Sequence, residues 1–426
     1  MKSLTQLLPL LSLISPSTSH PLSQRAPSLH LPLRTSGRDI LDSSSAPVLF
    51  AGTNWPGHQE AMIPEGLQYA SISSIVAWLP RLGLNTVRLT YATEMIDDIL
   101  SASPDQSLRA TLIKALGPEN GTVVLGQILA NNPDFTAETT RLEVFDAVAR
   151  EVAAQGIMLH LDNHVSKAGW CCGLNDGNGW FGEANFPVEN WVRGWGYIAG
   201  HAAKNWPSFV GAGLRNELRD AEVAEPVDWY TWYERMTAAA RAVHAAAPEA
   251  LIFFSGLDYD TWIDPVPLGK GLNGTVGTAT EGKTALFRPE DFEFKDKIVL
   301  ELHRYNMQLA NTPCPEFKAG WYQQGFQALD STNPETKYLF PIVLTEWGFG
   351  HDDESWNKYT YNQCLIEMAT EWKFGWMQWQ IGGSYMLRQG TQDFDETWAL
   401  LDHTWTKIRS QVTIDESIQK MIEALV

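Results

Sequence analysis

The sequence predicts a single-domain (β/α)8 TIM barrel with loop insertions, an α/β fold in which eight parallel strands close into a cylinder inside a ring of helices. Eight short apolar segments alternate with amphipathic helical patterns, which favours a parallel sheet. Nearly all of these segments end in polar or aromatic residues, where such barrels carry their chemistry. The turn after the first segment, 53–60, lacks the glycine-rich phosphate loop of a doubly wound sheet.

The expected strands are short and almost continuously apolar, as in strands that are buried on both faces. In chain order they are 47–55, 85–91, 156–164, 209–217, 250–259, 297–305, 340–348 and 375–383. Helical patterns with one apolar face lie between and after them. They are expected at 71–82, 141–155, 189–205, 231–246, 355–373 and 414–425. No linker interrupts this alternation, so we expect one domain from residue 46 to residue 426.

Two connections after strands are longer than a barrel needs. Residues 93–138 follow the second strand and are expected to form a wall of a cleft. Residues 385–405 follow the eighth strand, carry aromatic and acidic side chains, and are a candidate for a second wall.

The N-terminus has the pattern of a secretory signal peptide at 1–19. An apolar run at 7–14 precedes small residues up to Ser19, and it is too short to span a bilayer. A secreted, extracellular protein is therefore expected, with residues 20–45 as a lead-in or propeptide. In that setting the Asn-Gly-Thr sequons at Asn120 and Asn273 are candidates for N-glycosylation.

Four cysteines in a secreted chain favour disulfides over a metal site. Cys171 and Cys172 are adjacent and are expected to pair with Cys314 and Cys364 instead of with each other, in an order that the sequence leaves open. No CxxC or HExxH pattern is present, so no metal is expected.

The composition points away from nucleic acid and anionic membranes. The formal net charge is −19, and the 426 residues are 44% apolar, which is ample for a core. The 18 tryptophans exceed what core packing usually requires. Aromatic rings stack on the apolar faces of sugars, so this excess favours a carbohydrate ligand.

Two glutamates at strand ends indicate the chemistry. Glu217 closes the run 209–217 directly after Asn216, and Glu346 closes the run 340–346. Cleavage of a glycosidic bond needs one acid that protonates the leaving oxygen and a second carboxylate that attacks or stabilises the sugar. An ordinary ion-paired glutamate is the alternative for Glu217, and the matching glutamate on a second strand argues against it. No GxSxG elbow is present, which argues against an esterase.

These residues and others at strand ends resemble the family 5 glycoside hydrolases, the cellulase-like group of retaining (β/α)8 enzymes, from about residue 47 onward. The segments NWPGHQE, LRNELR, GSYMLRQG and LDNHVSKAGWCCGLNDGNGWFGE are similar to a branch of secreted plant and fungal members. The strand-end residues that carry the resemblance are Arg88, His164, Asn216, Glu217, His303, Tyr305, Glu346 and Trp379.

The resemblance implies that Glu217 is the general acid/base and Glu346 the nucleophile, with retention of anomeric configuration. Arg88 and Tyr305 are expected to keep Glu346 ionised, whereas a less polar setting is expected to raise the pKa of Glu217. Many members of the family have proline directly after the acid/base. This chain has Leu218 instead, a departure that bears on the substrate more than on the activity.

The resemblance also implies the sugar contacts. Asn216 would bond the sugar 2-hydroxyl, His164 and His303 would line the subsite, and Trp379 would be its stacking floor. Either histidine could instead be hydrogen-bonded structure. His160 and Asp162 are expected in the barrel interior as structural residues, and Trp376 in its wall. Three further tryptophans belong to outer subsites or to packing: Trp55, Trp170 and Trp180.

The expected activity is hydrolysis of β-linked poly- or oligosaccharides by a monomer without a cofactor. Alternatives within the class are a β-mannan, β-1,6-glycan or glycoconjugate hydrolase and a transglycosylase. A carbohydrate-binding barrel without activity is the alternative outside it. Endo or exo action stays open.

Overall fold

The structure, a computed structural model, describes residues 29–102, 104–221, 225–305 and 312–425. The expected signal peptide at 1–19 lies outside these ranges. None of the helices in the described ranges combines the length and the apolar character that a bilayer crossing requires.

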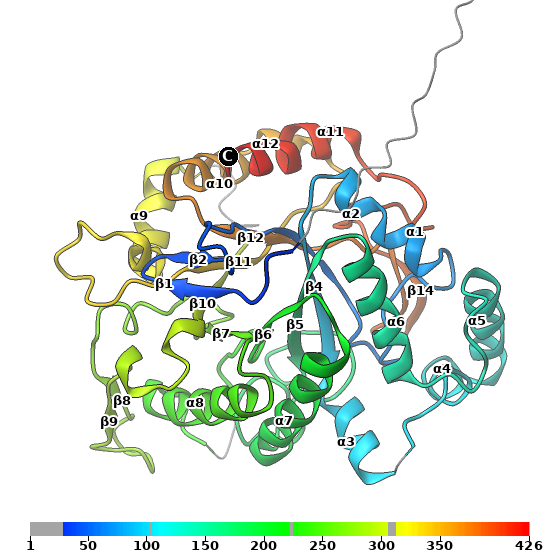
Figure 1. The fold of residues 1–426 in the computed structure, drawn as a ribbon, viewed down its shortest axis with the longest axis horizontal. Helices are drawn as coiled ribbons and strands as arrows, with labels where there is room; N and C mark the ends of the chain where they lie inside the picture. The colour runs from blue at the N-terminus through cyan, green and yellow to red at the C-terminus, as the bar shows by residue number, and fades with distance from the viewer. Residues whose placement is uncertain (1–28, 103, 222–224, 306–311, 426) are drawn as a thin grey trace, which may run out of the picture.

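Eight parallel strands close into a barrel in the order β10-β11-β12-β3-β4-β5-β6-β7 (Figure 1). This order confirms the predicted (β/α)8 class and all eight predicted strands. The barrel strands are β3 (Ala51–Trp55), β4 (Thr86–Ala92), β5 (Met158–Val165), β6 (Phe209–Gly213), β7 (Leu251–Ser255), β10 (Ile298–Arg304), β11 (Ile342–Trp347) and β12 (Gly375–Gln378).

Helices surround the barrel and are coloured along the chain in Figure 1. They are α1 (Ile72–Val76), α2 (Trp78–Arg81), α3 (Thr93–Ser101), α4 (Leu108–Leu116), α5 (Pro118–Asn131), α6 (Arg141–Ala154), α7 (Val188–Asn205), α8 (Trp229–Ala246), α9 (Cys314–Gln324), α10 (Thr360–Trp372), α11 (Gln411–Thr413) and α12 (Gln419–Glu423). Short 3-10 turns lie at Pro289–Asp291, Lys295–Lys297, Phe326–Leu329 and Glu354–Lys358, and a π turn at Ile414–Ile418.

The predicted helix at 71–82 is divided in two at Ala77. Pro80 explains the division, because its ring clashes with the carbonyl four residues earlier and it has no N–H to donate. The helix predicted at 141–155 forms as expected. A capping box between Thr140 and Glu143 satisfies its first backbone N–H groups.

Helix α7 fixes the irregular chain that follows β6. The indole nitrogens of Trp191 and Trp195 both donate to the carbonyl of Leu214 at 2.9 Å. Strand β6 ends at Gly213, so the predicted strand to residue 217 is four residues too long. The remaining residues turn away from the ladder, and Glu217 has a left-handed backbone with φ 49°.

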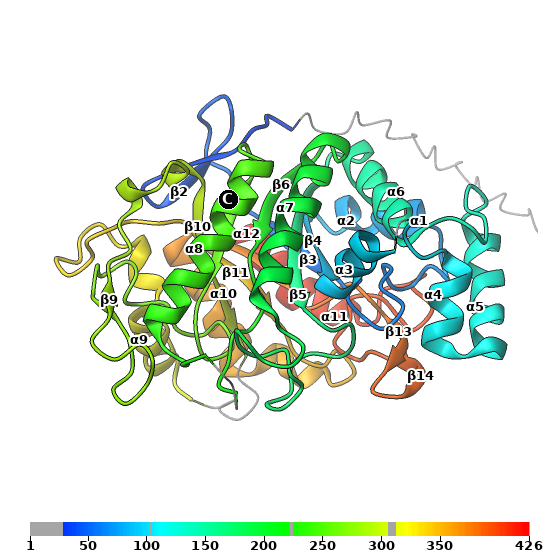
Figure 2. The same cartoon turned by 90° about the horizontal axis from the view of Figure 1, so that it is seen from below.

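An antiparallel hairpin, β1 (Arg34–Ser36) and β2 (Asp39–Leu41), covers one end of the barrel. Leu33 and Ile40 are buried in an apolar cluster with barrel residues such as Phe50 and Phe253. Figure 2 shows this hairpin on the opposite side of the molecule from a second hairpin, β13 (Ser384–Arg388) and β14 (Thr391–Asp395). The expected loose lead-in at 20–45 therefore contains ordered residues that close the barrel.

A two-stranded ribbon, β8 (Leu272–Asn273) and β9 (Thr284–Ala285), lies beside helix α8. The predicted sequon Asn273 is exposed on this ribbon, and Asn120 is exposed in the first turn of α5. Their glycosylation stays a prediction.

The disulfides differ from the expectation. Cys314 pairs with Cys364, and Cys171 pairs with its neighbour Cys172. The expectation that the adjacent cysteines pair elsewhere is wrong. Cys314 and Cys364 lie on neighbouring helices with Cα atoms 5.3 Å apart, a distance that suits a disulfide, so they satisfy each other.

Candidate active site

A cleft of about 550 Å³ opens at the carboxyl ends of the barrel strands. Six of the eight predicted site residues line it, and Arg88 and His303 lie directly beneath. The side chains that line the cleft are His164, Trp170, Cys171, Cys172, Asn216, Glu217, Tyr305, Glu346, Trp379, Arg388, Phe394, Asp395, Glu396, Thr397 and Trp398.

The two predicted catalytic glutamates meet in this cleft. A carboxylate oxygen of Glu217, one of Glu346 and a ring nitrogen of His303 all lie within 4.8 Å of one another. Retaining glycosidases hold their two carboxyl groups about 5–5.5 Å apart, whereas inverting enzymes leave about 6.5–9.5 Å for a water molecule. The observed spacing fits the retaining arrangement.

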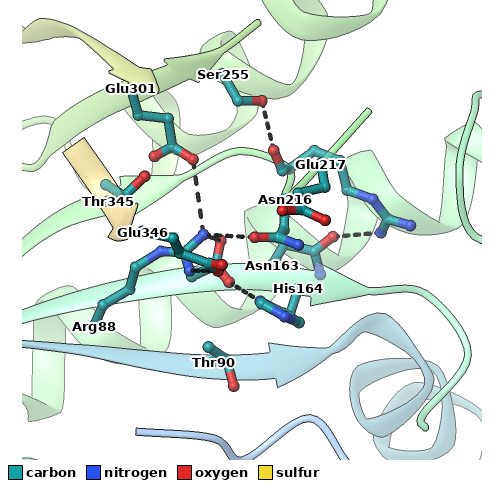
Figure 3. A network of polar contacts seen from close by, with 12 residues as sticks. Arg88, Thr90, Asn163, His164, Asn216, Glu217, Ser255, Glu301, Thr345 and Glu346 are labelled. Carbon is teal, nitrogen blue, oxygen red and sulfur yellow. Dashed lines mark hydrogen bonds and ion pairs between the residues drawn. The ribbon is translucent and has the colours of Figure 1, made fainter. Parts of the chain in front are cut away.

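Arg88, on β4, is the centre of the polar network beneath the cleft (Figure 3). Its Nη1 donates to Oε1 of Glu346 at 2.7 Å and to Oδ1 of Asn54 at 2.9 Å. Its Nη2 donates to Oδ1 of Asn216 at 2.9 Å and pairs with Oδ1 of Asp162 at 2.8 Å. One buried guanidinium therefore orients the candidate nucleophile and the asparagine expected at the sugar 2-hydroxyl.

Glu346 lies at the end of β11 among donors. The hydroxyl of Tyr305 donates to Oε2 of Glu346 at 2.9 Å, on the side opposite its bond to Arg88. Burial raises the pKa of Glu346 above its usual value, while the charge of Arg88 and the Tyr305 hydrogen bond act in the other direction. These contacts favour the ionised form that a nucleophile needs.

Glu217 has a different environment. Its Oε1 lies 3.0 Å from Nδ1 of His303, and its backbone N–H donates to Oδ2 of Asp260 at 2.7 Å. Burial raises the pKa of Glu217 to about 7, against the opposing charges of Arg219 and Arg88. A carboxyl that keeps its proton near neutrality suits a general acid, the role that the family resemblance implies for Glu217.

Asp260 is a site residue that the sequence analysis missed. It follows β7 in a run of left-handed residues, Asp258, Tyr259 and Asp260, which folds the loop back toward the barrel. Its Oδ2 holds the Glu217 N–H and lies 3.7 Å from Nε2 of His303. Burial lowers the pKa of His303 to about 4, so this ring is neutral at physiological pH.

His164 lies between two other rings. Its ring stacks on Trp379 with centroids 5.2 Å apart and an interplanar angle of 13°, and the His58 ring lies 4.0 Å away. Nδ1 of His164 is 2.8 Å from Oδ2 of Asp162, so His164 is both a hydrogen-bonded residue and part of the cleft wall. Burial lowers the pKa of His58 and of His164 well below the usual value. Sequence analysis did not single out His58, although it lies in the turn after the first strand.

A second layer of carboxyl groups lies in the barrel interior. Burial raises the pKa of Asp162 to about 6 and that of Glu301 to about 8, against the charge of Arg88. Gly213 leaves space for this layer, because a Cβ there would lie 2.8 Å from Nε2 of His160 and 3.3 Å from Oε2 of Glu301. The expectation that His160 and Asp162 are interior structural residues fits this position.

The walls of the cleft are only partly those expected. None of the lining residues comes from 93–138, so the prediction that this insertion forms a wall is wrong. It instead supports the β13–β14 hairpin, because Nε2 of Gln392 donates to the carbonyl of Leu116 at 3.0 Å. The prediction for 385–405 is confirmed by Arg388 and residues 394–398 in the lining.

The structure shows which of the three tryptophans with two possible roles, outer sugar subsite or packing, lies at the cleft. Trp170 lines the cleft, whereas Trp55 and Trp180 are fully buried. Trp376 is also buried and packs against Trp347, in agreement with its expected place in the wall. Trp398 lines the cleft next to Tyr305 and was missed.

Three groups among the described residues bring possible metal ligands within 4.8 Å of one another. One includes Cys171 and Cys172, whose sulfurs are bonded to each other and offer no thiolate. The other two contain Glu346 or Glu301, which already face the positive charge of Arg88.

A closed parallel barrel with a close pair of glutamates at its carboxyl end is the arrangement found in the barrel glycoside hydrolases. The family model described as Cellulase (glycosyl hydrolase family 5) matches residues 41–384. The chain belongs to glycosyl hydrolase family 5.

Known proteins agree with this assignment. A glycosyl hydrolase 5 family protein of Chamaecyparis obtusa is 32% identical over 395 residues, which are 90% of this chain and 65% of that protein. The catalytic domain of the major endoglucanase of Xanthomonas campestris pv. campestris superposes with a TM-score of 0.64 at 18% identity, over 92% of this chain and 99% of that one. An endocellulase of Pyrococcus horikoshii, solved with cellotetraose, gives 0.65 at 17% identity, over 92% and 98%. At such identities the two structures show the fold alone.

Proposed function

We propose that this protein is a retaining hydrolase of β-linked glucans, with Glu217 as acid/base and Glu346 as nucleophile. The observation that carries the proposal is the pair of carboxyl groups within 4.8 Å of each other, of which Glu346 accepts hydrogen bonds from Arg88 and Tyr305 while Glu217 faces His303. The Cellulase family model supports a β-glucan as the substrate class. The expected secretion would place the enzyme outside the cell, where such polymers occur.

In the first step, the ionised carboxylate of Glu346 attacks the anomeric carbon while Glu217 gives its proton to the glycosidic oxygen. The bond to the leaving group breaks, and a glycosyl ester on Glu346 forms. Asn216, oriented by Arg88, donates to the sugar 2-hydroxyl as positive charge develops on the ring. The Tyr305 hydroxyl, 2.9 Å from Oε2 of Glu346, helps to orient the attacking carboxylate.

In the second step, Glu217 is ionised and acts as the base. It takes a proton from water, which attacks the anomeric carbon and displaces Glu346. Two inversions give net retention. His303 is neutral and contacts both carboxylates, so it can orient them without supplying charge.

The test is a pair of alanine variants, assayed on an aryl β-glycoside with added azide. Removing one carboxyl should lower turnover by about 10²–10⁴-fold or more. In Glu217→Ala, azide should restore turnover on a dinitrophenyl glycoside and give the β-glycosyl azide. In Glu346→Ala, azide should attack directly and give the α-glycosyl azide.

Glu138→Gln is the matched control, because this side chain is 76% exposed and away from the cleft. It should retain wild-type turnover. Wild-type turnover in Glu217→Gln or Glu346→Gln, or inverted products by NMR with the wild-type enzyme, would reject the proposed roles. A panel of glucan, mannan and galactan substrates tests the substrate class.

A further inference from the structure

The bonded pair Cys171–Cys172 lies in the cleft beside the candidate acid/base. The Nδ2 of Asn216 lies 3.6 Å from Sγ of Cys171 and 3.5 Å from Sγ of Cys172. Both sulfurs and a carboxylate oxygen of Glu217 lie within 4.8 Å of one another. The disulfide thus forms part of the cleft surface where the proposed chemistry takes place.

Arg219 ties this disulfide loop to Glu217. Its Nη1 donates to the carbonyl of Glu217 at 2.8 Å, and its Nε donates to the carbonyl of Gly173 at 2.9 Å. Its Nη2 pairs with Asp176 at 2.6 Å, and the same carboxylate accepts the Gly173 N–H at 2.9 Å. The departure from proline after the acid/base therefore coincides with a buried arginine that fixes the loop against the site.

Trp170 precedes the disulfide and lines the same cleft. Residues of the β13–β14 hairpin hold its ring in place. The guanidinium of Arg388 lies 3.5 Å from the centre of the Trp170 ring, and Tyr385 meets that ring edge-on at 5.6 Å. Arg388 is fixed in turn by Glu396 at 2.6 Å. Two separate segments therefore position an indole and a disulfide next to each other.

We propose that the Cys171–Cys172 disulfide and Trp170 form a binding surface for the leaving group, and that this surface takes a ring with an apolar face. Glu217 must reach the glycosidic oxygen, so surface within 4.8 Å of its carboxylate faces the departing part of the substrate. Disulfide sulfurs are polarizable and only weak hydrogen-bond acceptors, which suits contact with a ring face. This inference rests on the proposed glycoside hydrolase function.

The test compares leaving groups in the double variant Cys171→Ala/Cys172→Ala. A glycosyl fluoride leaves as a single atom and cannot contact the surface, whereas an aryl glycoside and a disaccharide carry a ring. We expect kcat/KM to fall about tenfold for the ring-bearing substrates and to stay within about twofold for the fluoride. Loss with the disaccharide alone assigns the surface to a sugar, and loss with the aryl glycoside alone assigns it to an aromatic aglycone.

Two further variants make the result decisive. Trp170→Ala should give the same pattern and carries the test if the double cysteine variant does not fold. Cys314→Ala/Cys364→Ala, which removes the disulfide outside the cleft, should leave all three kcat/KM values unchanged below its melting temperature.

Equal losses on the fluoride and the ring-bearing substrates would overturn the inference, because the disulfide would then only hold Asn216 and Glu217 in place. Unchanged kcat/KM on all three substrates would overturn it as well. A wild-type protein inactive on every substrate would instead reject the hydrolase function on which the inference rests.

Discussion

Glu217 and Glu346 have the same side chain but different partners. Glu346 accepts hydrogen bonds from Arg88 and Tyr305, which stabilise its charge. Glu217 faces His303, a ring that burial keeps neutral, and its own pKa rises to about 7. The proposed division of roles therefore follows from which neighbours carry charge.

The pH dependence of activity should report these two groups. The acid must be protonated, so kcat/KM should fall as the pH rises through about 7, the pKa of Glu217. The nucleophile must be ionised, so activity should also fall on the acid side as Glu346 gains a proton. The measurement is kcat/KM from pH 4 to 9 on an uncharged aryl glycoside. An alkaline limb that persists in Glu217→Ala on a dinitrophenyl glycoside would contradict the assignment.

The sequence could predict site residues that stand at strand ends, because strand ends meet at one edge of the barrel. Glu346, His164 and Trp379 were found in this way. Asp260 was missed because left-handed residues fold its loop back, and His58 because its position depends on packing against His164. Neither feature produces a periodic pattern in the sequence from which it could have been predicted.

At the level of elements, buried strands were predictable because they are apolar on both faces. The residues at which the strands end were less predictable. The chain leaves β6 at Gly213, where tryptophans from α7 hold the Leu214 carbonyl, a contact between residues about 20 positions apart in the sequence.

Gly213 on β6 tests the packing of the barrel interior. In Gly213→Ala the new Cβ would meet Nε2 of His160 at 2.8 Å and Oδ1 of Asp162 at 3.2 Å. We expect a loss of about 1–3 kcal/mol in the free energy of unfolding, measured by urea denaturation. Gly126→Ala is the control, because nothing lies within 4 Å of its Cβ in α5, and it should gain about 0.5–1 kcal/mol. Equal effects of the two substitutions would contradict this account.

The two disulfides should differ in their effect on stability. Cys314–Cys364 spans a sequence separation of 50, and in the chain-entropy model such a link contributes about 4 kcal/mol at most. Cys171–Cys172 joins neighbours and closes no chain loop of that kind. The Cys314→Ala/Cys364→Ala variant should therefore lose several degrees in Tm by calorimetry, and Cys171→Ala/Cys172→Ala clearly less. A larger loss for the second variant would show that its loop supports the fold.

For the whole molecule, the sequence predicted the barrel and the place of the cleft but not both of its walls. The insertion at 93–138 is long enough to form a wall, yet it packs behind the β13–β14 hairpin and supports it. Length and position in the chain are visible in a sequence. The side to which a helical insertion folds depends on contacts with another insertion.

The buried carboxyl groups should make the stability of the whole protein depend on pH. Glu301 has a pKa of about 8 and Glu217 of about 7, both above the value of about 4.3 in an unfolded chain. Between pH 7.5 and 8.5 the folded protein holds carboxyl protons that the unfolded chain has lost, so stability should fall as the pH rises. The buried histidines have lowered pKa values, so they act in the opposite direction while the unfolded chain still loses its histidine protons. That contribution has faded above about pH 7.5, because an unfolded histidine has a pKa of about 6.5.

This dependence can be measured as Tm from pH 7.5 to 8.5. Each such group changes the unfolding free energy by up to about 1.4 kcal/mol per pH unit. Glu301→Gln, which cannot ionise, should show a flatter decline than the wild type. A Tm that is constant or rises over this interval would contradict the raised pKa values.

The β1–β2 hairpin closes the end of the barrel away from the cleft and is anchored there by Lys297, whose Nζ donates to the carbonyl of Leu33 at 2.8 Å. Anyone who expresses a trimmed version of this enzyme should therefore keep the residues from 31 onward. A shorter fragment that begins at residue 46 would expose the apolar barrel residues that Leu33 and Ile40 cover, and we expect it to aggregate. An affinity tag placed before that hairpin would stand far from the substrate.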